Sequence, residues 1–379
     1  MNEWKKVSLD QMGTVSRGKS KHRPRNDARL FGGKYPFIQT GDIGSAGLYV
    51  NEFSQTYNEE GLAQSKLWEK DTLCITIAAN IADTALLAFP ACFPDSIMGF
   101  VADPKISNVK FVKYCFDILQ RDCKQISQGA AQDNLSWKKL STIEFPCPPI
   151  EVQHRIATIL SRYDSLIENY QKQIKLLEEA AQRLYKEWFI DLRFPGHENT
   201  NLIDGVPEGW EKKKVGEIAP IITGKKDANF GTPNGEYPFF TCSQEPIKAP
   251  SFSFDCAAVL LAGNGDFNVK LYRGKFEAYQ RTYVLSPYCA QHLYLLYYTI
   301  SANMTKLAAG SSGSTIKFLT KGMIDGINLN IPNDEILRSF NKKVEPIQSS
   351  RESLQSQLRL LTEARDRLLP KLMSGEITV

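Results

Sequence analysis

The chain has 379 residues, of which 42% are hydrophobic and 23% charged, and its formal net charge is +4. This composition is typical of a globular protein with two or three domains, and no apolar run approaches the roughly 18 residues of a membrane span. The mild positive charge alone does not indicate a nucleic-acid partner. Because the N-terminus lacks an apolar signal region, we expect a cytoplasmic protein without membrane association.

Residues 1–149 read as a mixed domain of strands and helices. Short β-rich runs such as Thr72–Ile77 and Gly99–Ala102 alternate with Gly, Pro, Asn and Asp, and a helical pattern covers Phe111–Gln120. The run Arg17–Arg25 concentrates positive charge in a loop, where flexible cations could meet phosphates, although a solvated loop is equally compatible with it. Prolines at 146, 148 and 149 end the domain and favour a helix start after them.

A long amphipathic helix is predicted from about residue 150 to residue 189. Its apolar positions alternate in steps of four and three, which is an a/d seam held for about five heptads. Such a seam requires a helical partner. The seam positions are Ile156, Leu160, Tyr163, Ile167, Tyr170, Ile174, Leu177, Ala181, Leu184 and Trp188.

The partner comes from an internal repeat 184 residues downstream. A linker near 194–205 and a second mixed domain follow, with strand-like runs at Ala257–Ala262 and Thr282–Leu285. A second helix is predicted beyond Pro332, interrupted late by Pro370, so that its last turns are kinked or start anew. If a two-fold axis relates the copies, the two helices pair antiparallel. The corresponding positions are Phe340, Val344, Ile347, Arg351, Leu354, Leu358, Leu361, Arg365, Leu368 and Leu372.

Arg351 and Arg365 are the two departures from an apolar second seam, and we expect both guanidinium groups to extend to its rim. The helix flanks, including Glu178, Glu179, Arg183 and Lys186, are expected to be solvated faces. Two unrelated surface helices are the alternative reading. The coincidence of the two heptad registers argues against it.

Three anchors recur in the same order in front of the two helices. They are Trp4 and Trp210, the Gly18-Lys19 and Gly224-Lys225 turns, and the Tyr-Pro-Phe sequences at Tyr35 and Tyr237. Between these anchors, loop lengths and residue types diverge. One scaffold therefore carries two different surfaces.

The sequence does not support a nucleotide-binding, methyltransferase or zinc-binding motif. Gly13–Ser20 matches the phosphate-loop pattern, but Lys-His-Arg-Pro follows where a helix is required, and the second copy has Ala219 in place of the first glycine. There is no Asn-Pro-Pro-aromatic motif of an adenine methyltransferase. Eight cysteines and four histidines show no zinc-ligand spacing, so we expect reduced, mostly buried thiols, no metal, no cofactor and no catalytic residues.

One segment carries a resemblance to a known family. Gln128-Gly-Ala-Ala-Gln-Asp-Asn134-Leu-Ser136, the Phe145-Pro146 and Pro148-Pro149 pairs, and Glu151-Val-Gln153-His-Arg-Ile156 closely resemble the junction between recognition domain and conserved helix in type I restriction-modification specificity subunits. The second copy, from Gly310 to Ile336, is a looser version that departs at the Pro-Pro and Gln positions. Trp4 and Tyr35–Asp42 also resemble the opening of such a domain.

The resemblance implies an α+β fold with two pseudo-symmetric mixed α/β target-recognition domains separated by two long helices paired as an antiparallel coiled coil. The expected boundaries are 1–149 for the first domain, 150–192 for the first spacer helix, 193–332 for the linker and second domain, and 333–379 for the second helix. It also implies a non-catalytic subunit that reads an asymmetric bipartite sequence in double-stranded DNA. Its partners would be two modification (adenine methyltransferase) subunits and restriction subunits that carry the motor and nuclease.

Candidate DNA contacts follow from the chemistry of loops, because phosphates need positive charge and base edges need donors and acceptors. Any one of them could equally be an ordinary turn or surface residue. The phosphate candidates are Arg17, Lys19, Lys21, Arg23, Lys225 and Lys226. The base candidates are Gln39, Thr40, Asp42, Gln128, Gln132 and Asn134 in the first domain, and Ser243, Gln244, Asn264, Lys270, Arg273 and Ser314 in the second.

Two other functional classes stay open at this point. A coiled-coil scaffold with two paired protein-binding domains would share the helices, but its binding to DNA would not weaken steeply with salt. A stand-alone methyltransferase is opposed by the missing motifs.

Overall fold

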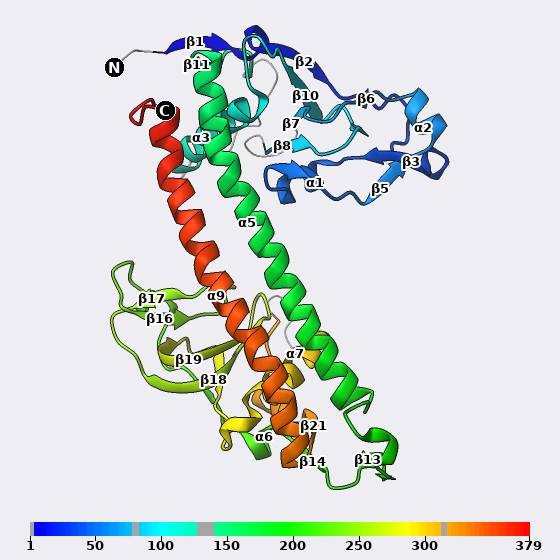
Figure 1. Ribbon diagram of the computed structural model, residues 1–379, viewed down its shortest axis with the longest axis vertical. Coiled ribbons are helices and arrows are strands. Elements are labelled where there is room, and N and C mark those ends of the chain that lie inside the picture. Colours follow the sequence, from blue (N-terminus) through cyan, green and yellow to red (C-terminus); the bar gives the residue numbers. More distant parts are fainter. Residues whose placement is uncertain (1–3, 78–82, 127–139, 312–316) are drawn as a thin grey trace. The chain divides into compact units, whose positions relative to one another are not determined.

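The computed structural model describes residues 4–77, 83–126, 140–311 and 317–379, with the side chains of residues 121–126 left aside (Figure 1). The chain divides into two compact units, Met1–Lys172 with Leu354–Val379, and Gln173–Ser353. Each unit combines one mixed α/β head with part of both long helices. In the described part of the chain, no helix is long and apolar enough to cross a membrane.

The first head belongs to the first unit and contains three small sheets. Their strand orders are β1-β11, β2-β10-β7-β8-β4 and β5-β3-β9-β6. The strands are β1 Lys5–Ser8, β2 Gly13–Arg17, β3 Phe31–Phe37, β4 Tyr49–Val50, β5 Gln55–Tyr57, β6 Leu67–Trp68, β7 Leu73–Thr76, β8 Thr84–Leu87, β9 Ala91–Cys92, β10 Ile97–Ala102 and β11 Glu144–Cys147; the helices are α1 Thr40–Ser45, α2 Glu59–Ala63 and α3 Val109–Ile126, with single 3-10 turns at Leu9–Gln11 and Ala28–Leu30.

The second head belongs to the second unit and is built around one six-stranded sheet, β15-β20-β18-β19-β16-β17, with the pair β14-β21 beside it and a hairpin β12-β13 in the linker. Its strands are β12 Leu202–Ile203, β13 Val206–Pro207, β14 Glu211–Lys214, β15 Ile221–Thr223, β16 Tyr237–Phe240, β17 Ile247–Ala249, β18 Phe254–Ala262, β19 Val269–Ala278, β20 Thr282–Leu285 and β21 Asn328–Ile331; the helices are α6 Val215–Ile218, α7 Leu293–Gly310 and α8 Lys321–Asp325, with 3-10 turns at His197–Asn199, Ala228–Phe230 and Ala290–His292.

The two heads share a construction that is interrupted in the first head. In the second head, β19 runs for ten residues and pairs with β18 and then with β16. In the first head the corresponding strand is split into β8 and β9, and Pro90 lies in the break. Proline has no N–H for a ladder hydrogen bond, which suits a break at this position. The neighbouring strand is also divided, into β6 and β7, where the second head has the continuous β18.

The 184-residue offset found in the sequence recurs in the secondary structure. Helix α3 and helix α7 both have 18 residues and start at Val109 and Leu293, and β11 and β21 both have four and start at Glu144 and Asn328. Their partners β1 and β14 pair in the same antiparallel register. The internal duplication is therefore a duplication of fold.

The long helices are α5, Ile150–Tyr185, which continues in a π-helical turn at Lys186–Ile190, and α9, Asp334–Met373. In the first unit, early α5 residues share a core with late α9 residues, Leu160 and Leu372 among them. In the second unit, late α5 residues share a core with early α9 residues, Tyr185 and Val344 among them. The helices therefore pair antiparallel in each unit (Figure 1).

None of the seam positions expected from the sequence is exposed. Ile156, Leu160 and Val344 are fully buried, and the middle of both seams is half-buried. A new helix start at Pro370 is wrong, since α9 continues through it to Met373. The sequence rule fails here because proline removes a single hydrogen bond, whose loss the packing of Leu369, Leu372 and Met373 outweighs.

Two expectations about charge on the helices are also wrong. Arg351 does not reach the rim of the seam but is buried, with 9% of its surface exposed, and pairs with Glu178. Glu178 is accordingly not a fully solvated flank residue. Arg365 is partly buried and pairs with Asp164 at 2.9 Å.

The cysteines are less buried than the sequence led us to expect. Of the seven whose side chains are described, Cys74, Cys92 and Cys115 are buried, three are half-buried and Cys289 is exposed. All seven are free thiols.

Candidate nucleic-acid interface

Three loops of the first head meet at one end of its strands. Gly18 donates its backbone N–H to Ile97 O at 2.8 Å, and Lys19 donates to Phe93 O at 3.1 Å. Ile38, after β3, donates to Cys92 O at 2.8 Å. A Cβ on Gly18 would lie 2.3 Å from Pro94 O, so only glycine permits this close crossing. We call residues 17–25, 38–42 and 93–96 the first loop cluster.

The phosphate candidates of the first head differ in how free they are. Arg17 and Lys21 are exposed and Lys19 is half-exposed, and none of these three side chains has a hydrogen-bond or ion-pair partner in the described residues. Arg23 folds back instead, donating to Ser20 O at 2.7 Å and to His22 O at 2.8 Å. The first three can therefore reach a phosphate without breaking an internal contact.

The base candidates of the first head follow β3. Gln39 is half-exposed, and its side-chain amide donates to Gln55 Oε1 at 2.8 Å. Asp42 accepts from the Gln39 N–H at 2.8 Å and so caps helix α1, which gives it a structural duty, while Thr40 is the first residue of that helix. Gln128, Gln132 and Asn134 lie outside the described residues.

Helix α5 supports this part of the first head. Glu168 accepts a hydrogen bond of 3.2 Å from the backbone N–H of Leu48, just after α1. Burial raises the pKa of the Glu168 carboxyl, and the backbone hydrogen bond opposes that rise. The helix thus holds the turn between α1 and β4, which follows the segment that carries Gln39 and Thr40. Sequence periodicity gave no signal for this contact.

A cation that the sequence reading missed lies beside Arg17. Lys66 is exposed, its ammonium stands 3.5 Å from the centre of the Trp68 ring and 3.5 Å from Ser16 Oγ, and Ser16 precedes Arg17 on β2. The ring holds the cation by a cation–π contact. Only a repeat or a charge run would have marked this residue, and Lys66 belongs to neither.

Four loops of the second head meet in the same way. Gln280 donates its N–H to Lys226 O at 2.9 Å, and Gly263 donates to Arg281 O at 2.8 Å. The Cys242 thiol lies 3.6 Å from Arg281 O. A Cβ on Gly224 would lie 1.9 Å from Ala278 O, so this glycine is required for the same steric reason as Gly18. We call residues 224–227, 241–245, 263–270 and 279–281 the second loop cluster.

Three base candidates of the second head come together in this cluster. Lys270 donates from Nζ to Ser243 O at 2.8 Å and also to Asn268 Oδ1, while Gln244 Nε2 lies 2.5 Å from Asp266 Oδ2. Burial lowers the pKa of the Lys270 ammonium. Asp266 and Asn268 were not anticipated, although their position between Gly265 and β19 is that of a turn able to present polar side chains.

Other candidates of the second head lie apart from this group. Arg273 occupies β19 three residues beyond Lys270, so alternation turns it to the opposite face of the sheet, where it donates to Tyr294 Oη at 2.5 Å. Asn264 pairs as a β-bridge with Phe318. Ser314 lies outside the described residues.

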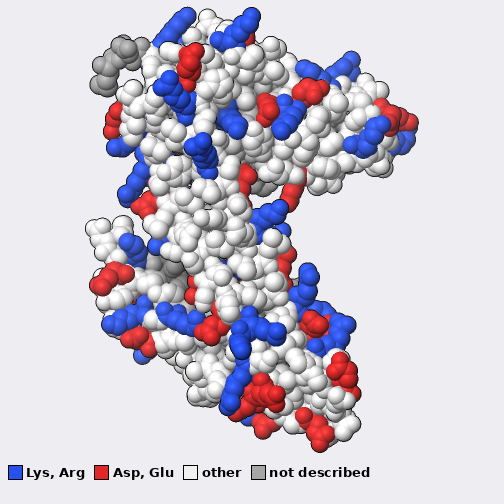
Figure 2. Space-filling model, in the orientation of Figure 1, with Lys and Arg blue, Asp and Glu red and all other residues white. Residues whose placement is uncertain are grey.

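The phosphate candidates of the second head are available to a ligand. Lys225 is exposed and without a side-chain partner in the described residues, and Lys226 lies 4.4 Å from the centre of the Phe230 ring. Arg281, which the sequence reading missed, is an exposed cation in the same cluster. Figure 2 shows that lysines and arginines on the visible face are interspersed with acidic residues, so the basic character is local.

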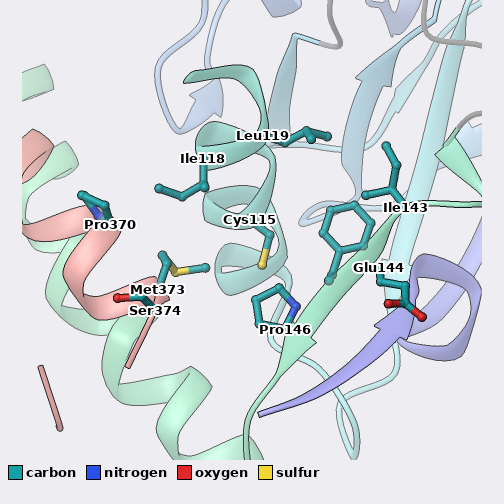
Figure 3. A pocket seen from close by; sticks show the side chains of 10 residues that line it. Cys115, Ile118, Leu119, Ile143, Glu144, Pro146, Pro370, Met373 and Ser374 are labelled. Carbon is teal, nitrogen blue, oxygen red and sulfur yellow. The ribbon is translucent and has the colours of Figure 1, made fainter. Parts of the chain in front are cut away.

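A pocket of about 360 Å³ in the first unit is of another kind. Figure 3 shows Cys115 and Ile118 of α3, Pro146 of β11, and Pro370 and Met373 of α9 around it. Its lining is mostly apolar and supplies no cation, so we do not assign it to phosphate or base contacts.

In the described residues, no group of three or more His, Cys, Asp or Glu side chains is arranged to hold a metal.

Comparison with known proteins decides the family. The model of the type I restriction modification DNA specificity domain matches residues 1–179 and again residues 207–350. The chain belongs to this family. Each matched region covers one head and part of the long helix that follows it, and the resemblance drawn from the sequence is confirmed.

Relatives of this specificity-domain chain carry the same designation. It is 26% identical over its whole length to the type I restriction enzyme MjaIX specificity subunit of Methanocaldococcus jannaschii, covering 94% of that protein. It is 37% identical to the EcoDI specificity subunit of Escherichia coli over 46% of the chain, and this alignment spans only 40% of that protein. The fold is shared with the S subunit of a type I system from M. genitalium, at a TM-score of 0.67, 17% identity and coverage of 97% and 96% of the two chains.

Proposed function

We propose that this specificity-family chain is a non-catalytic subunit of a type I restriction-modification complex that reads a bipartite, asymmetric sequence in double-stranded DNA. The observation that carries the proposal is the pair of loop clusters. Both are built at the same end of the same strands around an obligatory glycine, yet they present different polar side chains. Equal scaffolds with unequal reading surfaces suit two half-sites of different sequence.

Phosphate and base contacts are divided between residues by their chemistry. We propose that Arg17, Lys19, Lys21, Lys225 and Lys226 contact phosphates, with a smaller share for Arg23, whose guanidinium is engaged in its own loop. We propose that Gln39, Thr40, Gln244, Ser243 and Lys270 face base edges. Gln128, Gln132, Asn134 and Ser314 stay candidates of the sequence reading.

The long helices would serve as the spacer between the half-sites and as the docking surface for two modification subunits and for restriction subunits, all within the cytoplasm. We propose that the recognition domains span residues 1–149 and 193–332 and that the spacer helices span residues 150–192 and 333–379. Methyl transfer and cleavage would belong to the partners.

Retention on duplex DNA across a salt series tests the DNA-reading proposal. The chain, with and without its modification subunit, should bind a cognate duplex with a logarithmic affinity that falls linearly with the logarithm of salt concentration, by about 0.9 per phosphate contacted. A protein scaffold would show no such slope. Methyl transfer by the chain alone would contradict the non-catalytic assignment. Methylome sequencing of cells that express the chain with its methylase would give the target sequence.

The spacer role has its own test. Inserting one heptad after Ile174 and one after Leu358 keeps both seams in register and lengthens each helix by about 10 Å. At about 3.4 Å per base pair, the gap between half-sites should grow by about three base pairs with both half-sites unchanged. An unchanged gap with altered half-sites would reject the spacer role.

A further inference from the structure

Two ion pairs join the long helices, and both have the same polarity. Arg365 of α9 pairs with Asp164 of α5 at 2.9 Å in the first unit, and Arg351 of α9 pairs with Glu178 of α5 in the second. The arginines are 14 residues apart and so are their carboxylates. Since 14 residues are two heptads, both pairs belong to one antiparallel register.

Each pair is completed by a tyrosine of the neighbouring head. Tyr114 of α3 donates to Asp164 at 2.5 Å, and Tyr297 of α7 lies 2.9 Å from Arg351 Nη1 and 3.3 Å from Glu178 Oε1. Arg351 and Asp164 are therefore buried between the seam and the head, while Arg365 and Glu178 are partly buried there. Such groups are costly when their partner is missing.

The repeat gives these four residues no symmetric twin. With the 184-residue offset, Arg365 corresponds to Ala181 and Arg351 corresponds to Ile167. In the opposite direction, Asp164 corresponds to Gln348 and Glu178 corresponds to Thr362. Helix α5 thus carries both carboxylates of the seam pairs, and helix α9 carries both arginines.

This asymmetry distinguishes like from unlike helix pairs. If the α5 helix of a second copy took the place of α9, Asp164 would face Ala181 and Glu178 would face Ile167. If the α9 helix of a second copy took the place of α5, Arg365 would face Gln348 and Arg351 would face Thr362. The first arrangement deprives Asp164 and Glu178 of their arginines. The second deprives Arg351 of Glu178 and leaves Arg365 only its neighbour Asp366, whereas α5 with α9 pairs all four residues.

We propose that these four residues select the seam partner, so that α5 accepts an α9 helix and rejects the α5 helix of a second copy. The duplicated heptads alone would permit both pairings, because Ile156, Leu160, Val344 and Leu372 are interchangeable apolar residues. The charges therefore supply the discrimination that the apolar seam lacks. The inference does not depend on DNA recognition.

Charge reversal in the full chain tests it. One variant, D164R/E178R, places arginines on both sides of each pair; the other, R351E/R365D, places acids on both sides. Each alone should melt at a lower temperature than the parent chain. A chain with all four substitutions should regain much of the lost melting temperature, because each arginine–carboxylate pair is restored with its polarity reversed.

Co-expression gives the decisive result. The two double variants, carrying different tags, should exchange helices and copurify as a 1:1 dimer, since α5 of each is complementary only to α9 of the other. Mixed dimers should exceed like dimers by about tenfold in multi-angle light scattering and pull-down. If a double variant does not fold alone, rescue by co-expression replaces the melting measurement.

Two control substitutions test whether any charge reversal on these helices has the same effect. Glu179→Arg and Arg359→Glu reverse exposed charges on the same helices outside the seam and should change neither melting nor assembly. The proposal is overturned if the four-fold variant melts as low as the double variants, or if co-expression yields like dimers as often as mixed ones.

Discussion

The hydroxyl of Tyr114 donates a 2.5 Å hydrogen bond to the Asp164 carboxylate, tying helix α3 of the first head to α5. Both residues are buried, and burial together with the nearby carboxylate raises the pKa of the Tyr114 phenol, so it stays a donor. At the 184-residue offset stand Tyr298 and Gln348, which are also hydrogen-bonded to each other. The duplication has therefore kept the position of a buried polar contact while changing its charge.

Replacing Tyr114 by Phe should destabilise the first unit by about 1–2 kcal/mol, because Asp164 loses a charged hydrogen bond but keeps Arg365. Urea unfolding would measure the loss, and hydrogen exchange should localise it to α3 and the first half of α5. Tyr288→Phe is the matched control, because Tyr288 is 73% exposed. Equal effects of the two substitutions would contradict the role given to Tyr114.

Glu168 gives a prediction for the recognition segment. Glu168→Ala removes the acceptor of the Leu48 N–H and should weaken binding to cognate DNA about tenfold, equivalent to roughly 1.4 kcal/mol, through the first half-site only. Glu168→Gln keeps an acceptor oxygen and should restore most of the affinity. Fluorescence anisotropy with duplexes mutated in one half-site separates the two halves, and Glu179→Ala on the exposed face serves as control. A loss that fell equally on both half-sites would count against this contact.

The phosphate candidates predict a change in salt dependence and not in sequence preference. Arg17→Ala, Lys21→Ala and Lys225→Ala should each reduce the slope of log affinity against log salt by about 0.9, on cognate and non-cognate duplexes alike. Arg338→Ala is a suitable control, because that side chain is paired with Asp334 on α9. A variant that changes which sequence is bound, with its slope intact, would instead have lost a base contact.

The sequence predicted the repeat, the helix seams and the loops that we propose as the site, because these depend on periodicity and on glycines that no other residue replaces. Gly18 and Gly224 are examples, each crossing a backbone carbonyl too closely for a Cβ. The sequence did not show which side chains pair with one another across the two helices. Asp164 and Glu178 look like solvated helix residues until the antiparallel register brings Arg365 and Arg351 to them.

Arg273 shows why single base candidates could not be chosen from sequence. Three positions along a strand separate it from Lys270, and the alternation of β19 sends the two side chains to opposite faces. The sequence contained both residues in one polar stretch, but it did not show which face the cluster of loops would occupy. Asp42, likewise a base candidate, also caps helix α1 by accepting the Gln39 N–H.

These placements predict opposite phenotypes for two basic residues of one strand. Arg273→Ala should lower stability by about 1–2 kcal/mol, through loss of the Tyr294 hydrogen bond and the cation–π contact at 5.1 Å, and should leave the target sequence unchanged. Lys270→Met should alter or relax the second half-site with a smaller effect on stability. Thermal melting and binding to a randomised duplex library would distinguish them; altered sequence preference for Arg273→Ala would reverse the assignment.

His292 sets a pH dependence in the second unit. Burial lowers its pKa from the ordinary 6.5, Lys213 lowers it further, and Asp334 opposes them in part. Because the folded-state pKa lies below the unfolded value, the stability that His292 contributes is complete above pH 6.5 and is lost as the pH falls through the folded pKa. The melting temperature should therefore decline on acidification from about pH 8 to about pH 5.5 more for the parent chain than for His292→Gln, which cannot be protonated. Parallel declines in the two proteins would show that other groups set the acid sensitivity.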